Sequence, residues 1–548
     1  MRRTRDGLGF IAGCAAALSL MAAPASSQTG RGATSGQLVR VDSGAILGKR
    51  LPSGVRAFLG IPYVAPPVRQ LRWREPQPVK AWSGVFNADR FSPECLQGLR
   101  NRNGNQFFGE EATSEDCLYL NVWAPATARK APVVVFIYGG AFNIGSAAMP
   151  IYGGEGVAKR GAVFVNFNYR LGPFGFMAHP ALTAESAGHA SGNYALLDQI
   201  AALKWVQRNI EKFGGDPNNV TIAGQSAGGA SVSLLQASPL AQGLFQRVIS
   251  MSGNSVSPGF MGGAVTRAQA EADGVAFQSA LGASDIGQMR ALGGDRILTG
   301  RPRGVGLGWG PIIDGYVLPA AAADVFAGKR QNDVPLMVGF TSDESFNPLA
   351  DAKSIADYQA RARRAFGDRA DELLRLYPAA TDADAARASR EAARDASVAL
   401  ATRDYARAQV TAGRSPAFVY FFSKAHRYPP GVVLSDLDPA TAGAYHTSEV
   451  PFWFDAIDAF NKIRPTRAWT AGDHALVDRM AATLISFARA GRPTVPGGVA
   501  WPAYDPQQER IVEFGDQVRV ISWPNREKLD FFRAASPQRP AVSGEVRD

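Results

Sequence analysis

One stretch of the chain joins an apolar strand pattern, a glycine-flanked serine and a helical pattern. Residues 220–223 read Val-Thr-Ile-Ala, and Gly-Gln-Ser-Ala-Gly follows directly at 224–228. A serine on so tight a strand-to-helix turn is pushed out of the sheet, and glycines flank it because side chains there would meet neighbouring backbone. The chain holds 58 glycines, but this motif occurs once, in the context that it requires. The sequence therefore predicts an exposed, reactive Ser226.

A serine hydroxyl needs a base to take its proton and a carboxylate to orient that base. On strand–turn–helix scaffolds the partners follow in the order serine, acid, histidine. The histidines after Ser226 are His426, His446 and His474. His474 opens a helical pattern, which favours a helix surface, and His426 lies beside an arginine and two prolines, which favours a solvated loop. We therefore expect His446, which lies just before the aromatic residues of segment 451–454, to be the base.

The carboxylate is expected on a loop that follows a strand between the serine and the histidine. Val-Pro-Leu-Met-Val-Gly-Phe at 334–340 has the composition of a buried strand. Asp343 and Glu344 follow it, and the residue pattern does not separate them, because a loop carboxylate is by default a solvated charge. Both residues therefore remain candidates at this point.

Strand patterns alternate with helical patterns along most of the chain. The strands are expected at 133–137, 162–167, 220–223, 248–251, 336–340 and 418–422, with helices such as 196–210 between them. This alternation predicts an α/β protein with a mostly parallel sheet covered on both faces. No linker, repeat or charge block divides the chain, so we expect one large domain over 28–548. Its Ala/Arg/Asp-rich stretch at about 352–411 is expected to be a helical excursion that forms a lid or gorge wall.

The N-terminus has the three regions of a secretory signal. Basic residues at 2–5 precede an apolar run at 8–23 and small residues after it, so we expect cleavage near residue 25 or 27 and export to the periplasm or the medium. A lipoprotein anchor at Cys14 is disfavoured because few apolar residues precede it, and the two arginines at 2–3 lack a convincing twin-arginine motif. No other segment reaches the ~20 apolar residues of a membrane span.

Charge and motif content disfavour several other functions. The formal charge of +10 becomes +8 when the signal, with three arginines and one aspartate, is removed. The positive charges are scattered, so nucleic acid is not an expected partner, although a modest positive field would favour anionic esters. The glycines at 304–310 follow no strand and lack dinucleotide-binding spacing. We therefore expect no cofactor and no metal.

Taken together, these segments resemble the type-B carboxylesterases, the family of cholinesterases and bacterial para-nitrobenzyl esterases, over nearly the whole mature chain. The likeness is carried by the serine motif at 213–228, Glu-Asp-Cys-Leu-Tyr-Leu-Asn-Val-Trp-Ala-Pro at 115–125 and Tyr-Gly-Gly-Ala-Phe at 138–142. Shorter matches lie at 310–315, 343–344, around 446, at 487–493 and at 501–504. The resemblance implies an α/β-hydrolase fold and ester hydrolysis through an acyl-enzyme.

The resemblance also implies roles for single residues. It makes Glu344 the triad acid, within a family Asp-Glu-Gly pattern that here ends in Ser345, and the family's usual His-Gly is His446-Thr447. Fixed backbone N–H groups stabilise the oxyanion of the tetrahedral intermediate. The serine turn supplies the N–H of Ala227, and the family pattern adds those of Gly140 and Ala141. Ala141 stands where many relatives have a third glycine. Its methyl group would narrow the acyl-binding side of the active site if it points inward.

Two cysteines, Cys95 and Cys117, remain after signal removal, and the family closes a loop with a disulfide at these places. An oxidising compartment permits that bond. No tryptophan lies between the two cysteines, whereas cholinesterases hold a quaternary ammonium on one there through cation–π attraction. The loop instead holds Phe107 and Phe108, whose rings attract a cation less strongly than tryptophan does, and Arg100 and Arg102, which would repel a cation. Choline esters are therefore not expected substrates.

Two classes of function follow from the resemblance. The first is an exported serine carboxylesterase acting on a small-molecule ester, with aryl or anionic esters as candidates and a triacylglycerol lipase as the alternative enzyme. The second is a non-catalytic binding or adhesion module, because some relatives on this scaffold have lost the triad. Ser226, Glu344 and His446 are all present. We therefore expect the enzyme.

Overall fold

The computed structural model describes residues 37–98, 100, 103–106, 111–257, 265–300, 309–344 and 346–535, which belong to one compact unit. The expected signal at 1–27 with Cys14 lies outside the described residues, as do Arg102, Phe107, Phe108 and Ser345. Within the part that is described, no helix combines the length and the apolar character needed to cross a membrane.

A large mixed sheet organises the described residues. Eleven strands lie in the order β18-β17-β16-β15-β12-β11-β9-β10-β8-β4-β3. Neighbours from β17 to β10 run parallel, whereas β18 at one edge and β8, β4 and β3 at the other pair antiparallel. Their bounds, in chain order, are β3 Lys49–Arg50, β4 Arg56–Pro62, β8 Tyr119–Ala124, β9 Ala131–Ile137, β10 Val163–Phe167, β11 Gly215–Gln225, β12 Arg247–Met251, β15 Leu336–Thr341, β16 Ala417–Phe422, β17 Arg510–Phe514 and β18 Val518–Ser522.

The central strands are apolar along their whole length because both faces of the sheet are covered. Every residue of β9 and β10 is buried, which is typical of parallel strands under helices on both sides. Val133 of β9 pairs with Val163 of β10, and Val134 pairs with Thr221 of β11. The expectation of a mostly parallel sheet is confirmed for its centre.

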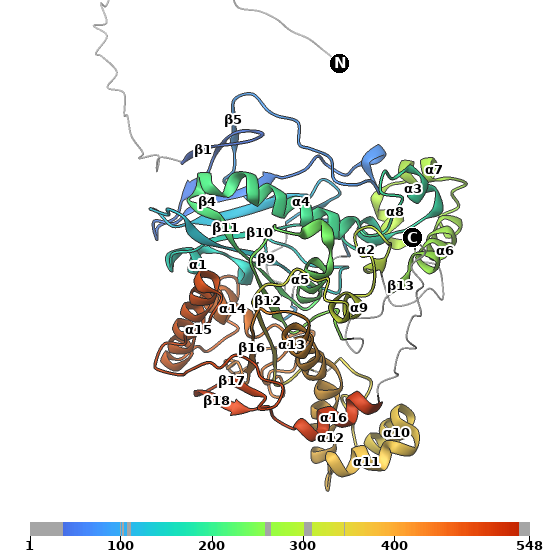
Figure 1. The fold of residues 1–548 in the computed structure, drawn as a ribbon, viewed down its shortest axis with the longest axis vertical. Coiled ribbons are helices and arrows are strands. Elements are labelled where there is room, and N and C mark those ends of the chain that lie inside the picture. Colours follow the sequence, from blue (N-terminus) through green and yellow to red (C-terminus); the bar gives the residue numbers. More distant parts are fainter. Residues whose placement is uncertain are drawn as a thin grey trace, which may run out of the picture. The chain divides into compact units, whose positions relative to one another are not determined.

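Helices pack on both faces of this sheet. In Figure 1, α1 (Glu155–Lys159), α14 (Val450–Trp453) and α15 (Ala471–Ala490) lie to the left of the strands. To the right lie α5 (Ala227–Ala237) and α13 (Leu400–Ala412), and α4 (Tyr194–Asn209) packs against α5 and β11. Both α5 and α15 contact β9 and β11, so the middle of the sheet is enclosed between them.

The stretch expected to form a helical excursion contains a run of helices. These are α10 (Ile355–Phe366), α11 (Ala370–Leu376) and α12 (Asp382–Arg394), which a π-helical turn at Asp395–Ala399 joins to α13. Helix α12 begins with a capping box in which Thr381 and Asp384 each satisfy the other's backbone N–H. The C-terminal helix α16 (Arg526–Ala535) packs against the π-helical turn and α13.

Shorter elements complete the described chain. Three small sheets are formed by β1 (Leu38–Val41), β2 (Gly44–Leu47) and β5 (Val85–Asn87), by β6 (Glu94–Cys95) and β7 (Thr113–Ser114), and by β13 (Val265–Thr266) and β14 (Ile312–Ile313). The remaining α-helices are α2 (Gly172–Phe176), α3 (Pro180–Glu185), α6 (Arg267–Ala280), α7 (Ile286–Ala291), α8 (Gly294–Thr299) and α9 (Ala322–Ala327).

The parallel strands bring distant sequence segments to one edge of the sheet. Strand β11 ends directly before Ser226, β15 ends three residues before Glu344, and β9 ends directly before segment 138–142. Carboxyl ends of neighbouring parallel strands meet at the same edge, where ligand sites of open α/β sheets usually lie. This edge therefore gathers the residues singled out in the sequence.

Candidate active site

Ser226 occupies a strained turn between β11 and α5. Its φ of 57° and ψ of −121° lie outside the ordinary regions for a residue with a side chain. A Cβ at Gly224 would come within 2.1 Å of the Gly228 oxygen, and a Cβ at Gly228 within 1.9 Å of the Ile137 oxygen. Glycine is thus required on both sides of Ser226, whose own N–H is fixed by the oxygen of Met251 at 2.8 Å.

Glu344 contacts the imidazole of His446. Its Oε2 lies 2.6 Å from His446 Nδ1, with the carboxylate fully buried and the imidazole 18% exposed. Its other oxygen, Oε1, accepts hydrogen bonds from the backbone N–H of Thr341 at 2.5 Å and the hydroxyl of Ser252 at 2.7 Å. Both carboxylate oxygens are therefore occupied, which fixes the plane that faces the imidazole.

Asp343, the other sequence candidate for the acid, faces elsewhere. Its Oδ2 accepts from the backbone N–H of Ala444 at 2.9 Å, and its own N–H donates to the Ala444 oxygen at 3.1 Å. These two bonds join the loop after β15 to the loop that carries His446. Asp343 thus holds the two loops together, and its neighbour Glu344 contacts the imidazole.

The far side of the His446 ring meets the residue next to Ser226. Gln225 Nε2 lies 3.0 Å from His446 Nε2. A Cβ on Gly139 would lie 2.7 Å from Ser226 Cβ and 2.9 Å from Gln225 Oε1, so the serine side chain and the glutamine amide border the same small space. Phe346 packs edge-on against the imidazole, with 4.5 Å between ring centroids. The structure thus brings His446 to the serine turn.

The glycine-rich segment after β9 lies at the same edge of the sheet. Ala141 and Phe142 adopt left-handed backbone, with φ of 51° and 63°. The Ala141 oxygen accepts a hydrogen bond from Asn143 Nδ2 at 2.5 Å, and Ala141 itself is exposed. Ala227 is buried at the first position of α5. A residue with a side chain is thus accommodated at 141 in a backbone region that usually favours glycine.

A second buried carboxyl lies behind the Glu344–His446 pair. Ser252, whose φ is 49°, also lies 3.3 Å from Glu449 Oε1, so one hydroxyl stands between two carboxyl groups. Burial, together with the nearby Glu344 carboxylate, raises the pKa of Glu449 to about 8. Among the described residues, none donates a hydrogen bond to its Oε2. Sequence reasoning assigned no role to Ser252 or to Glu449, although Glu449 lies three residues after His446, because their contact joins segments that are distant in the chain.

The solvated position expected for His426 is wrong. Only 6% of His426 is exposed, and its ring packs against Tyr445 and Trp469. It contacts the Ser448 oxygen through Nε2 at 3.0 Å and accepts from Arg467 Nε through Nδ1 at 3.1 Å. Burial and the Arg467 cation hold its pKa well below the usual value. Aromatic neighbours from several segments cover it, which the adjacent arginine and prolines did not indicate.

The loop between the cysteines borders both the glycine-rich segment and His446. A disulfide joins Cys95 and Cys117. Gln97 exchanges two hydrogen bonds with the backbone of Gly145, at 2.9 Å each. Gln106 Nε2 donates to the His446 oxygen at 3.2 Å and contacts Thr447 Oγ1. The described part of this loop thus supports two segments of the candidate site.

The remaining sequence candidates do not join the cluster. His474 is exposed on α15, as its helical pattern indicated. Across the described ranges, no three histidine, cysteine, aspartate or glutamate side chains gather as a metal site would require.

Thr447 follows His446 and stands where the family pattern has glycine. Its φ of 80° is an uncommon value for a β-branched residue.

Comparisons with known proteins agree with this architecture. The model of the carboxylesterase family matches residues 35–532. A fumonisin B1 esterase of Sphingopyxis macrogoltabida is 39% identical over 88% of this chain and 87% of its own length. A para-nitrobenzyl esterase of Bacillus subtilis is 33% identical, over 90% and 97% respectively. A solved structure of a PNB esterase superposes with a TM-score of 0.76 at 32% identity, covering 92% of this chain and 99% of its own.

These likenesses span almost the whole described chain, and the matched structure confirms the α/β-hydrolase fold. The relatives named above, and a human cocaine esterase 32% identical over 93% of this chain, are all esterases by name. The resemblance drawn from the sequence motifs is therefore confirmed, and the chain belongs to the carboxylesterase family, as a carboxylic ester hydrolase.

Proposed function

We propose that the protein is an exported serine carboxylesterase in which Ser226, His446 and Glu344 form the catalytic triad. The observation that carries this proposal is the 2.6 Å contact between Glu344 Oε2 and His446 Nδ1 at the serine turn. A carboxylate in this position holds Nδ1 protonated and leaves Nε2 unprotonated, as a base requires. The site thus has a nucleophile, a base and an orienting acid in the required order along the chain.

The reaction proceeds in two halves. His446 Nε2 takes the proton of the Ser226 hydroxyl as Oγ attacks the ester carbonyl, and the imidazolium then gives that proton to the leaving alcohol. A water molecule repeats the attack on the acyl-enzyme, and the carboxylic acid is released as Ser226 recovers its proton. Glu344 stays ionised throughout and stabilises the imidazolium. Gln225, 3.0 Å from His446 Nε2, must give way when the serine hydroxyl takes that position.

Backbone N–H groups of Gly140, Ala141 and Ala227 are proposed to hold the oxyanion. Ala227 begins α5, where the first N–H groups of a helix lack partners within the helix and the helix dipole favours negative charge. Gly140 and Ala141 follow β9 at the same edge of the sheet. One such donor is typically worth about a hundredfold or more in rate.

Kinetics on a panel of esters tests this function and its substrate class. The relatives carry names that point to fumonisin B1, para-nitrobenzyl esters and cocaine. The panel therefore contains fumonisin B1, a para-nitrobenzyl ester, a neutral aryl ester and a carboxylate-bearing aryl ester of equal size. A net positive charge favours the anionic member of the matched pair. Added salt should reduce that preference, because it screens the attraction.

Two outcomes would replace the proposal. Activity that rises sharply when tributyrin exceeds its solubility would indicate a lipase, and no hydrolysis of any ester in the panel would favour a non-catalytic module.

Export is supported by the disulfide between Cys95 and Cys117, since such bonds persist in oxidising compartments. Cell fractionation tests it, and full-length protein retained in the cytoplasm would contradict it.

A further inference from the structure

A groove lies between α9, α13 and α16, and Ser226, Glu344 and His446 are not among its lining residues. Its volume is about 520 Å³, within the range of about 300–1,000 Å³ typical of small-molecule sites. One wall is apolar, formed by Phe326 and Ala323 of α9, Ala408 and Ala412 of α13, and Val256. The groove can therefore take the hydrocarbon part of a small molecule.

The polar part of the groove carries an excess of positive charge. Lys329, Arg407 and Arg533 line it, whereas Asp404 is the one carboxylate among the lining residues. Arg533 pairs with Asp404, which also accepts from Ser257 Oγ at 3.1 Å. Lys329 is exposed and forms no ion pair with any residue that the structure describes. The lining thus leaves cationic groups that Asp404 does not neutralise.

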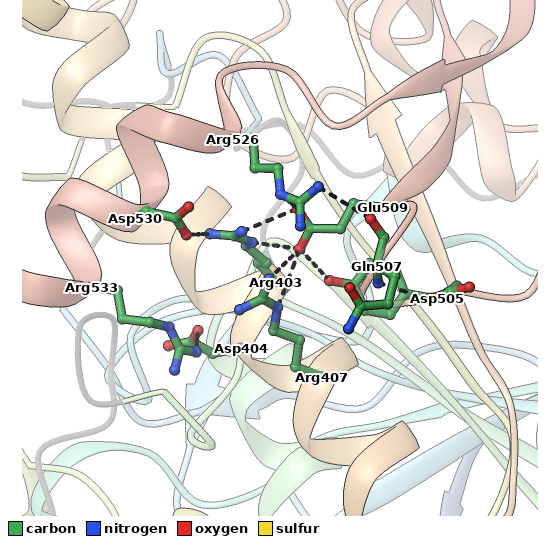
Figure 2. Close-up of polar contacts among 10 residues, drawn as sticks. Arg403, Asp404, Arg407, Asp505, Gln507, Glu509, Arg526, Asp530 and Arg533 are labelled. Atoms are coloured by element: carbon green, nitrogen blue, oxygen red, sulfur yellow. Dashed lines mark hydrogen bonds and ion pairs between the residues drawn. The ribbon is translucent and has the colours of Figure 1, made fainter.

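The residues behind the groove do not remove this excess. Figure 2 shows the guanidinium groups of Arg403, Arg407 and Arg526 converging on the single carboxylate of Glu509. The nitrogen–oxygen distances are 2.8, 2.7 and 3.0 Å, and only 1% of the Glu509 side chain is exposed. Arg403 has a second carboxylate partner in Asp530, at 2.6 Å. Glu509 is therefore shared among three cations and cannot neutralise Arg407 alone.

Glu509 is ionised in this network. Burial by itself would raise its pKa, but hydrogen bonds and charge attraction from Arg403, with help from Tyr504 and Arg407, hold the pKa below its usual value. The side chain of Arg403 is fully buried behind the groove, whereas those of Arg526 and Asp530 are 48% and 57% exposed. Four arginines and Lys329 outnumber the four carboxylates here, those of Asp404, Asp505, Glu509 and Asp530. A bound anion would reduce this imbalance.

We propose that this groove binds an organic monocarboxylate with a short apolar body. The carboxylate would lie between Lys329 and Arg407, and the hydrocarbon would lie against Phe326, Ala323 and Ala408. Organic carboxylates are the acid products of a carboxylic ester hydrolase, so the enzyme produces the chemical class that the groove fits. The proposal does not depend on which residues form the triad.

Binding of octanoate to the full-length protein tests the proposal by isothermal titration calorimetry. The protein is first inactivated with a fluorophosphonate, so that the active site cannot take up octanoate as a product. We expect one site for octanoate, with Kd at or below about 1 mM, and much weaker binding of 1-octanol and of octylammonium at equal chain length. A Kd above 10 mM, or equal affinities for octanoate and octanol, would overturn the proposal.

Two neighbouring cations provide a matched pair of variants. Lys329→Met keeps the aliphatic stem but removes the charge from the groove, and it should raise the Kd of octanoate about fivefold, since an exposed charge pair contributes up to ~1 kcal/mol. Arg330→Met removes an adjacent exposed charge that does not line the groove and should leave Kd within about twofold. Equal effects of the two changes would mean that general surface charge attracts octanoate, and the groove would be excluded.

A third variant tests the apolar wall. Ala408→Trp fills the groove without changing its charge and should abolish octanoate binding while esterase activity of the untreated protein is retained. Undiminished binding in a folded Ala408→Trp protein would contradict the proposed position of the hydrocarbon. If Ala408→Trp does not fold, Ala323→Leu makes the same test with a smaller side chain.

Discussion

Asp343 and Glu344 are adjacent in the chain, yet their side chains join different partners. Glu344 Oε2 contacts His446 Nδ1 at 2.6 Å, whereas Asp343 Oδ2 accepts from the backbone N–H of Ala444 at 2.9 Å. One residue can therefore orient the imidazole while its neighbour positions the loop that carries it. Neutralising each carboxylate in a separate variant distinguishes these two roles.

Glu344→Gln should lower kcat by about 10³-fold or more, because a neutral amide cannot hold His446 Nδ1 protonated or stabilise the imidazolium. Asp343→Asn keeps an oxygen acceptor for the Ala444 N–H and should cost less than about tenfold. Steady-state kinetics on one aryl ester measures both changes. If Asp343→Asn were the more damaging substitution, Glu344 would not be the acid.

Ser252 is expected to be a positioning residue for Glu344. Its hydroxyl donates to Glu344 Oε1 at 2.7 Å, and hydrogen bonds to charged groups are worth about 1.5–3 kcal/mol. Ser252→Ala should lower kcat by roughly tenfold with little change in KM, and it should shift the acidic limb of the kcat profile against pH. Ser397→Ala is the control, because within the described residues that buried hydroxyl bonds to backbone oxygens alone. Equal kinetics in both variants would exclude the role.

Glu449 should make the protein less stable as the pH rises through neutrality. Its pKa of about 8 in the fold exceeds the ordinary value of 4.5, so the folded protein binds the proton more tightly than the unfolded chain does. Stability from this group is therefore complete below about pH 4.5 and is lost as the pH rises to about 8. Between pH 6.5 and 8 the loss should be about 2 kcal/mol.

Denaturant unfolding of wild type and Glu449→Gln at pH 6.5, 7.25 and 8 measures this effect. The variant should lack the part of the decline that Glu449 causes, so the difference between the two proteins should change with pH. His426 is present in both proteins, so it does not alter the difference between them; its pKa is lowered, and its own contribution to stability changes mainly below about pH 7. Parallel curves for the two proteins would show that Glu449 does not titrate in this range.

The disulfide should matter more for stability and substrate binding than for the chemical step. The bond between Cys95 and Cys117 closes a loop of about 20 residues, which restricts the unfolded chain by roughly 3 kcal/mol in the chain-entropy model. Cys95→Ser/Cys117→Ser should therefore lower Tm and raise KM, with a smaller change in kcat. A peptide map under non-reducing conditions checks the bond first, and two free thiols in protein collected from the periplasm or the medium would refute it.

Much of the central sheet follows from local composition. Parallel strands buried on both faces, such as Val133 to Ile137, are continuously apolar and bounded by turns, so they are recognisable in the sequence. The antiparallel edges were not predicted, because short strands such as β3 and β18 carry exposed or half-buried residues and no continuous apolar pattern. Their pairing depends on neighbours that are distant in the chain.

The candidate site was predictable where a backbone requirement marks it. The glycines around Ser226 are needed by close contacts, and the chain order of serine, acid and histidine left few choices. The choice between Asp343 and Glu344 came from family resemblance, since two adjacent carboxylates differ only in where the folded loop points them. Ser252 and Glu449 could not be found, because their importance depends on contacts between segments about 200 residues apart.

Labelling with an organophosphate tests the central claim most directly. The purified protein is treated until esterase activity is lost, and peptides from it are analysed by mass spectrometry. A single adduct on Ser226, together with a folded but inactive Ser226→Ala protein that takes up no label, is the expected result. An adduct on another serine at full inactivation, or hydrolysis by Ser226→Ala at the wild-type rate, would contradict the assignment of Ser226 as the nucleophile.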